Sequence, residues 1–158
     1  MKRRTILMTV IASALTLALP GGVVKASGAF TQTVHFSLFN ATVPVTCAGA
    51  MTGVTAANAT GNGVGHQTGN ANGVWDTSTF TGDGTITISP PGTTYQGHIQ
   101  EWDGFEGNKQ NFVVHETFNF QGTNVADPTQ SLNMHVNFDR TTNADGTVTA
   151  FHADVSCQ

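Results

Sequence analysis

The sequence predicts an all-β protein, specifically an antiparallel up-and-down β-barrel of about eight strands that follows an N-terminal signal peptide. Three observations predict this fold class. No amphipathic helix of convincing length occurs after residue 26, and Thr, Val and Phe alternate with polar residues as in half-buried strands. Gly, Asn and Asp gather between these segments, where turns are expected. A barrel leaves no exposed sheet edge, and a two-sheet sandwich is the alternative.

The first 26 residues have the composition of a secretory signal peptide. Three cationic residues precede an apolar run over residues 6–19, which a Pro-Gly pair ends. This run is shorter than the roughly 20 residues that a membrane-spanning helix needs. Small residues up to Ala26 predict cleavage there, which leaves residues 27–158 as one secreted, extracellular domain. Arg3 and Arg4 also fit a twin-arginine export signal, although the general secretory route is favoured.

The mature chain is strongly acidic. Only Lys109 and Arg140 remain as cations against ten carboxylates, so the net charge is near −8 with neutral histidines. Such a surface cannot neutralise a run of phosphates, and this argues against nucleic acid and anionic membranes as partners.

Cys47 and Cys157 are the two cysteines of the chain and lie near the two ends of the mature domain. In an exported protein this pair predicts one structural disulfide. Closing a loop of that length contributes about 4 to 5 kcal/mol in the chain-entropy description. A reactive pair or a metal site would call for a C-x-x-C spacing, which the sequence lacks.

The strands follow from the alternation between turn signals. In the first of them Val34, Phe36 and Leu38 share one face and His35 lies on the other. The Gly/Asn-rich stretch over residues 61–76 is either a hairpin or a wide loop. We expect strands at residues 31–39, 46–56, 58–66, 73–80, 84–89, 94–105, 109–122, 130–140 and 147–157.

Turn chemistry predicts how the last four strands pair. Gly107 and Asn108 suit a two-residue hairpin turn, a loop is centred near Val125, and residues 143–146 form another turn. The last turn brings Phe151 close to Val136 or Phe138. The other expected pairs are Tyr95 with Phe120, Ile99 with Glu116, Glu101 with Val114, Phe118 with Leu132, Glu116 with Met134, Val114 with Val136, and Phe112 with Phe138.

The predicted pairing forms two sets of chemically active side chains, one on each face of the sheet. Glu116 and Glu101 lie on the apolar face, with Asp103 further along it. Carboxyl groups paired in an apolar interior raise each other's pKa, so they form either a general acid/base or a polar anchor for a ligand. The alternative is a solvated position at a barrel mouth, or bonds to Tyr95 or to backbone. The candidate ligand-binding residues are Glu116, Glu101, Tyr95, Phe112, Phe118, Met134 and Phe138.

The opposite face carries a row of histidines. The predicted register places His135 opposite His115 and His152 near His135, and β-carbons on neighbouring strands lie about 5 Å apart. They are either solvated cross-strand partners or a weak, open zinc or copper site, to which Asp154 could contribute.

The segment "YQGHIQEWDGFEGNKQNFVVHETFNFQGT", the strand "SLNMHVNF" and the cysteine near the C-terminus together resemble a group of small exported bacterial β-barrel proteins, known best among actinobacteria. The resemblance covers nearly the whole mature chain and implies a barrel without implying an activity. Gly73-Val74-Trp75 is more distantly similar to the G-x-W motif of lipocalins, which lies in their first strand rather than in mid-chain.

The sequence contains no G-x-S-x-G, H-E-x-x-H, phosphate-binding loop or dinucleotide-binding motif. We therefore expect a secreted protein that binds a small apolar ligand or acts as an extracellular interaction module. The alternatives are a barrel enzyme of the isomerase or cyclase type that uses Glu116 and Glu101, and a weak metal binder that uses the histidine row.

Overall fold

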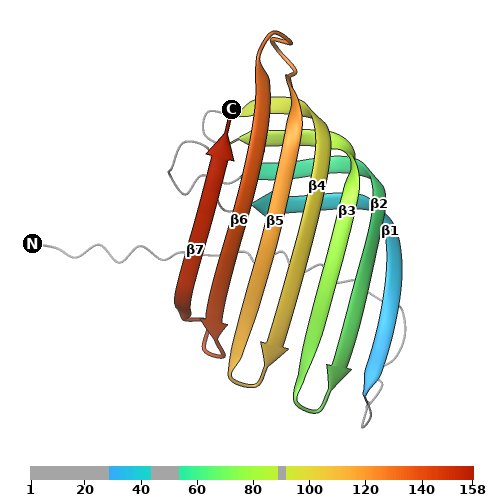
Figure 1. The fold of residues 1–158 in the computed structure, drawn as a ribbon, viewed down its shortest axis with the longest axis vertical. Helices are drawn as coiled ribbons and strands as arrows, with labels where there is room; N and C mark the ends of the chain where they lie inside the picture. The colour runs from blue at the N-terminus through green and yellow to red at the C-terminus, as the bar shows by residue number, and fades with distance from the viewer. Residues whose placement is uncertain (1–28, 44–53, 89–91) are drawn as a thin grey trace, which may run out of the picture.

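The computed structural model describes residues 29–43, 54–88 and 92–158. These residues form a single seven-stranded antiparallel sheet in which each strand pairs with the next one along the chain (Figure 1). None of the described residues forms a helix long and apolar enough to cross a membrane. The strands are β1 (Phe30–Val43), β2 (Val54–Asn70), β3 (Gly73–Ile88), β4 (Thr93–Asn108), β5 (Asn111–Asn124), β6 (Ser131–Asn143) and β7 (Val148–Cys157).

The all-β prediction is confirmed, but the closed barrel is wrong for the described residues. β1 and β7 are the two edges of the sheet and do not pair with each other, and the described strands do not divide into two sheets. The strands are also fewer and longer than expected, because the turns predicted near Asn58 and Thr81 lie inside β2 and β3. Sharp bends within long strands replace the separate short strands of a barrel.

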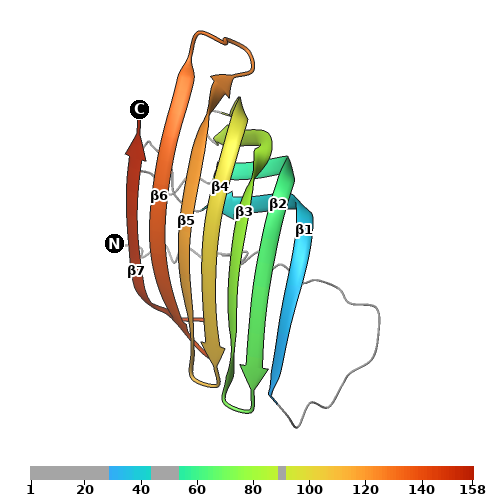
Figure 2. The same cartoon turned by 45° about the vertical axis from the view of Figure 1, so that its right-hand side comes forward.

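These bends fold the sheet over at one end. Figure 1 shows the upper ends of β1, β2 and β3 turning sideways and running behind β4 and β5 toward β6, and Figure 2 shows the same bend from a second side. The bends coincide with β-bulges in the β1–β2 and β2–β3 pairings, and Asn58 has a positive φ of 53°. A Cβ atom at Gly61 would lie 2.1 Å from the carbonyl oxygen of Thr81, so only glycine permits this close approach of two backbones.

The core lies where the folded-over ends meet the rest of the sheet. Phe118, on β5, is fully buried in this core, which also includes Val43 and Val54 from the bent strands. This core brings together side chains from strands that are distant in the sheet order. The folded end is therefore closed by side-chain packing and not by a complete ring of hydrogen bonds. The core side chains are Val43, Val54, Ala56, Ala59, Phe80, Ile86, Ile99, Phe118, Phe120, Leu132, Met134, Val136 and Phe138.

The hairpin registers differ from the predicted ones by four residues. The β4–β5 turn consists of Lys109 and Gln110 rather than Gly107 and Asn108, because the Asn108 side chain closes it: its Oδ1 accepts hydrogen bonds from the backbone N–H groups of Gln110 and Asn111. The next loop is displaced in the same way. The observed pairs are Tyr95 with Asn124, Ile99 with Phe120, Glu101 with Phe118, Phe118 with Val136, Glu116 with Phe138, Val114 with Arg140, and Phe112 with Thr142.

A shift of four residues leaves every side chain on its predicted face, because side chains alternate with a period of two. Glu116 and His115 therefore lie on opposite faces, as expected. The turn at residues 143–146 also brings Phe151 to Phe138, and their ring centroids lie 6.3 Å apart. The predicted signal peptide at residues 1–26 and Cys47 lie outside the described residues, so the signal and the Cys47–Cys157 disulfide stay predictions.

Candidate functional site

Four carboxylate side chains lie together on the face of the sheet that also carries the core, which we call the inner face. Asp103 of β4 is directly opposite Glu116 of β5, Glu101 lies two residues along β4, and Asp76 lies on β3 opposite Phe105. Sequence analysis placed Glu101 and Glu116 on this face, and the observed register adds Asp76. We call Asp76, Glu101, Asp103 and Glu116 the acidic band.

Glu101 is the most deeply placed member of the acidic band. It lies between Phe80 and Phe118, its direct neighbours on β3 and β5, and only 8% of its surface is exposed. Its Oε2 atom is buried and has no hydrogen-bond partner among the described residues. A buried polar atom without a partner costs about 1 to 3 kcal/mol, so this carboxyl group is held against its solvation preference.

Burial and mutual repulsion raise the pKa values of the whole band. Burial, followed by the charges of Asp103 and Glu116, raises the pKa of Glu101 to about 8. Burial and the charge of Asp103 raise the pKa of Glu116 to about 7, against the opposing effect of Arg140. The pKa of Asp103 rises to about 6 through burial and the charge of Asp76. Near neutral pH the band therefore holds protons that it would not hold in water.

The remaining two polar neighbours of the band come from β2 and β6. The Gln67 side chain donates a hydrogen bond to Asp76, which partly offsets the burial that raises the pKa of this aspartate. Arg140 lies on the inner face of β6 opposite Val114, and its Nε atom is buried without a partner among the described residues. Sequence analysis missed Arg140 as a neighbour of Glu116, because the predicted register set Val136 in its place.

Apolar side chains border the acidic band on the side away from the core. Phe105 and Phe112 stack with ring centroids 6.0 Å apart, and Phe112 remains 40% exposed although it is a large apolar side chain. A hollow of about 400 Å³ lies over these rings and is lined further by the β2–β3 and β4–β5 turns. We call Val74, Phe105, Phe112, Val114 and Phe151 the apolar rim, and the band and the rim together the inner-face site.

The candidate ligand-binding residues divide between this site and the core. Glu101, Glu116 and Phe112 belong to the inner-face site. Phe118 and Met134 are fully buried in the core, Phe138 is nearly so, and Tyr95 packs against the core at the folded end. Phe105, Phe151 and Arg140 are site residues that sequence analysis did not select.

On the outer face the histidine row is rearranged. His115 of β5 and His152 of β7 both lie opposite Asp139 of β6, and His115 Nδ1 bonds the Asp139 carboxylate. His135 lies four residues away along β6, where it bonds Asn119, so its predicted place opposite His115 is wrong.

A shallow hollow of about 410 Å³ lies over this part of the outer face. The described residues contain no cluster of three or more ligands arranged to hold a metal ion. The zinc or copper site stays a prediction, and His115 and His152 are its adjacent candidates. The hollow is lined by Trp102, His115, Glu116, Thr117, Asn137, Asp139, His152 and Asp154.

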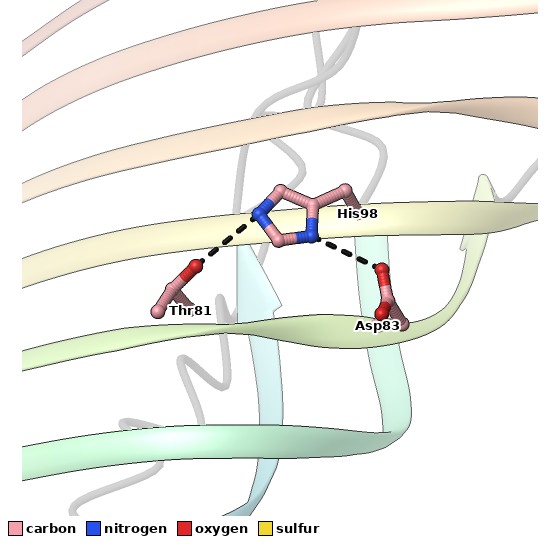
Figure 3. A network of polar contacts seen from close by, with 3 residues as sticks. All are labelled: Thr81, Asp83 and His98. Carbon is pink, nitrogen blue, oxygen red and sulfur yellow. Dashed lines mark hydrogen bonds and ion pairs between the residues drawn. The ribbon is translucent and has the colours of Figure 1, made fainter.

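Another histidine of the outer face, His98, has the hydrogen-bond order of a catalytic triad. Figure 3 shows His98 between Thr81 and Asp83, with 3.2 Å from Thr81 Oγ1 to His98 Nε2 and 3.0 Å from His98 Nδ1 to Asp83 Oδ1. Asp83 is 81% exposed, however, and the neighbouring backbone N–H groups belong to strand ladders. Without a site for an oxyanion, this network is a cross-strand polar contact.

No protein-family model, curated protein or solved structure matches this chain. The function therefore has to be argued from the geometry of the described residues.

Proposed function

We propose that this chain is an exported binding protein that holds a small, largely apolar molecule in the inner-face site. The observation that carries the proposal is the buried Oε2 atom of Glu101, which lies between two phenylalanines and has no hydrogen-bond partner among the described residues, in a band whose other end adjoins the open apolar rim. Ligand sites combine an apolar lining with a few convergent polar groups. The acidic band supplies the polar anchor and the rim supplies the apolar contact.

The open end of the inner face supports this role. The folded end is filled by the core, whereas Phe112 and Phe151 remain substantially exposed at the other end. Exposed large apolar side chains that gather next to polar groups mark binding surfaces more often than isolated ones do. A ligand that covers these rings would remove apolar surface from water, with a gain of about 25 cal/mol per Å².

Fluorescence of the uncharged dye Nile red tests the proposal. We expect its emission to shift to the blue and to intensify when the protein is added, because the dye enters an apolar environment. Phe112→Asp should abolish the change. Trp102→Ser is the matched control, since Trp102 is exposed to 42% on the outer face and Phe112 to 40% on the inner face. An unchanged dye spectrum, or loss of the signal in the Trp102 variant alone, would contradict the proposal.

A proton-transfer enzyme of the isomerase type is the second candidate function. It is favoured by the pKa values of Glu101 and Glu116, about 8 and 7, which are close to the operating range of a general acid and base. Deuterium uptake next to the carbonyl of phenylbutanone, followed by NMR in heavy water, would detect this activity. If the wild-type protein exchanges deuterium faster than a Glu101→Gln/Glu116→Gln protein, the enzyme is favoured. Equal exchange rates would support ligand binding without catalysis.

A further inference from the structure

We propose that the inner-face site selects organic cations, with an ammonium group at the acidic band and an elongated apolar body along the rim. This inference deepens the proposed function and rests on it. It names the chemical class of the ligand.

The charge balance of the site carries the first step. The inner face brings together Asp76 from β3, Glu101 and Asp103 from β4, and Glu116 from β5, against Arg140 from β6 as the sole cation among its described residues. The adjacent inner-face side chains of β1, β2 and β7 are uncharged: Gln32, Gln67, Ala153 and Phe151. With the carboxyl groups ionised, the negative charges of the site outnumber the single positive charge of Arg140, so an anionic ligand would be repelled.

Polar atoms of the site that lack hydrogen-bond partners also favour a cationic ligand. Arg140 forms no salt bridge with the band in the described part of the chain, and Glu101 Oε2 has no donor. An ammonium group brings three donors and a charge, so it can satisfy several carboxylate oxygens at once. The nearby phenylalanine rings attract cations through their π faces as well.

The spacing along β5 sets the length of the ligand. Phe112 lies at the rim and Glu116 in the acidic band, four residues apart on the same face. At about 3.3 Å per residue, the two positions are roughly 13 Å apart. A phenyl group joined to an ammonium group by a short alkyl chain spans most of this distance, whereas a small compact amine would reach only the band.

Proton linkage gives the proposal a signature of its own. The acidic band holds protons at neutral pH, since its pKa values lie between about 6 and 8 for Asp103, Glu116 and Glu101. A bound ammonium group favours the ionised carboxylates and therefore releases protons. Binding should weaken as the pH falls through this range, because the ligand then competes with the protons of Glu101 and Glu116.

The experiment compares three probes of one shape: phenylbutylammonium, phenylbutanol and phenylbutyrate. Each is titrated against Nile red bound to the full mature protein, and calorimetry in two buffers of different ionisation heat measures proton release. Near pH 7.5 we expect the ammonium probe to bind about tenfold tighter than the alcohol, with the carboxylate weakest, because a charge-assisted hydrogen bond is stronger than a neutral one. The preference should disappear near pH 5, which lies below the pKa values of Glu101, Asp103 and Glu116.

Two variants separate the acidic band from the overall charge of the protein. Glu101→Gln/Glu116→Gln should remove the preference for the ammonium probe and keep the affinity for the alcohol. Glu106→Gln removes one carboxylate from the exposed, outer face of β4 and should leave the preference unchanged. Circular dichroism checks that the variants fold.

The outcomes distinguish the two proposals. Equal binding of ammonium and alcohol would overturn the cation preference and support the apolar binding site alone. Displacement of the dye by calcium ions at low concentration would overturn the organic class in favour of an inorganic cation. A bound dye that none of the three probes displaces would overturn the cation preference alone, whereas failure of the dye itself to bind would overturn the proposed function.

Discussion

Glu101→Gln should make the protein more stable at slightly alkaline pH and leave its stability almost unchanged in acid. In the folded protein the pKa of Glu101 is raised from 4.5 to about 8, chiefly by burial. Between these two values the folded state binds more protons than the unfolded state. The free energy of unfolding therefore falls as the pH rises through this window, and it falls no further above the folded pKa.

The size of the effect follows from the same two pKa values. Each pH unit in the window corresponds to about 1.4 kcal/mol. Because Asp103 and Glu116 share the local electrostatic field and some water reaches the site, we expect a total of about 2 to 4 kcal/mol rather than the full difference. Glutamine has the same shape as protonated glutamic acid and cannot ionise, so the variant should lack this part of the pH dependence.

Urea unfolding, followed by the fluorescence of the two tryptophans, measures the effect near pH 5, 6.5 and 8. The wild-type protein should lose stability across this series, and Glu101→Gln should lose less. Glu106→Gln on the outer face of β4 is the control and should follow the wild type. If Glu101→Gln and the wild type lose stability in parallel, the carboxyl group is solvated and the reasoning about the acidic band is refuted.

Further outcomes are expected for the two cysteines, the core and the histidine row. Cys47 and Cys157 should be linked in the exported protein, so mass spectrometry without reductant should find no thiol to alkylate, and reduction should lower the unfolding free energy by about 4 kcal/mol. Phe118→Ala should cost about 3 to 5 kcal/mol in urea unfolding, since this ring is fully buried in the core, and a loss below 1 kcal/mol would contradict its position. His115→Ala should change stability by no more than about 0.5 kcal/mol, because His115 and Asp139 are both half exposed. In zinc calorimetry, His115→Ala and His152→Ala should each reduce any observed heat of binding, whereas His135→Ala should not.

The faces of the strands could be predicted from the sequence, and the registers could not. Glu116 and His115 fall on opposite sides because they are consecutive in a strand, and a register that moves by an even number of residues leaves each on its predicted face. The register itself depends on which residues close a turn. Gly107 and Asn108 have the composition of a two-residue turn, but the Asn108 side chain caps the turn that follows it. Composition alone does not distinguish these two uses of the same asparagine.

The bends explain why the closed barrel was wrong. Gly61 and Gly82 suggest a chain reversal when they are considered as isolated turn residues, yet they are paired neighbours inside β2 and β3. Their missing side chains allow the backbones to approach closely at the bend. Whether a glycine ends a strand or bends it depends on the neighbouring strand, which the local sequence does not specify.

The candidate site was predicted in part for the same reason. Glu101 and Glu116 were placed together because alternation assigns them to the apolar face. Asp76 and Arg140 join them only through the observed pairings of β3 with β4 and of β5 with β6. In the sequence, each of them is a charged residue at an inner-face position of a strand. Only the register shows which other charged residues lie beside it.

The most direct test of the account is an NMR titration of the carboxyl carbon of Glu101, with and without phenylbutylammonium. Binding of an organic cation at the acidic band requires a buried carboxyl group on the inner face that the cation can reach. We expect a titration midpoint near pH 8 in the free protein and a lower midpoint when the probe is present. A midpoint near the ordinary value of 4.5 in both samples would contradict this expectation.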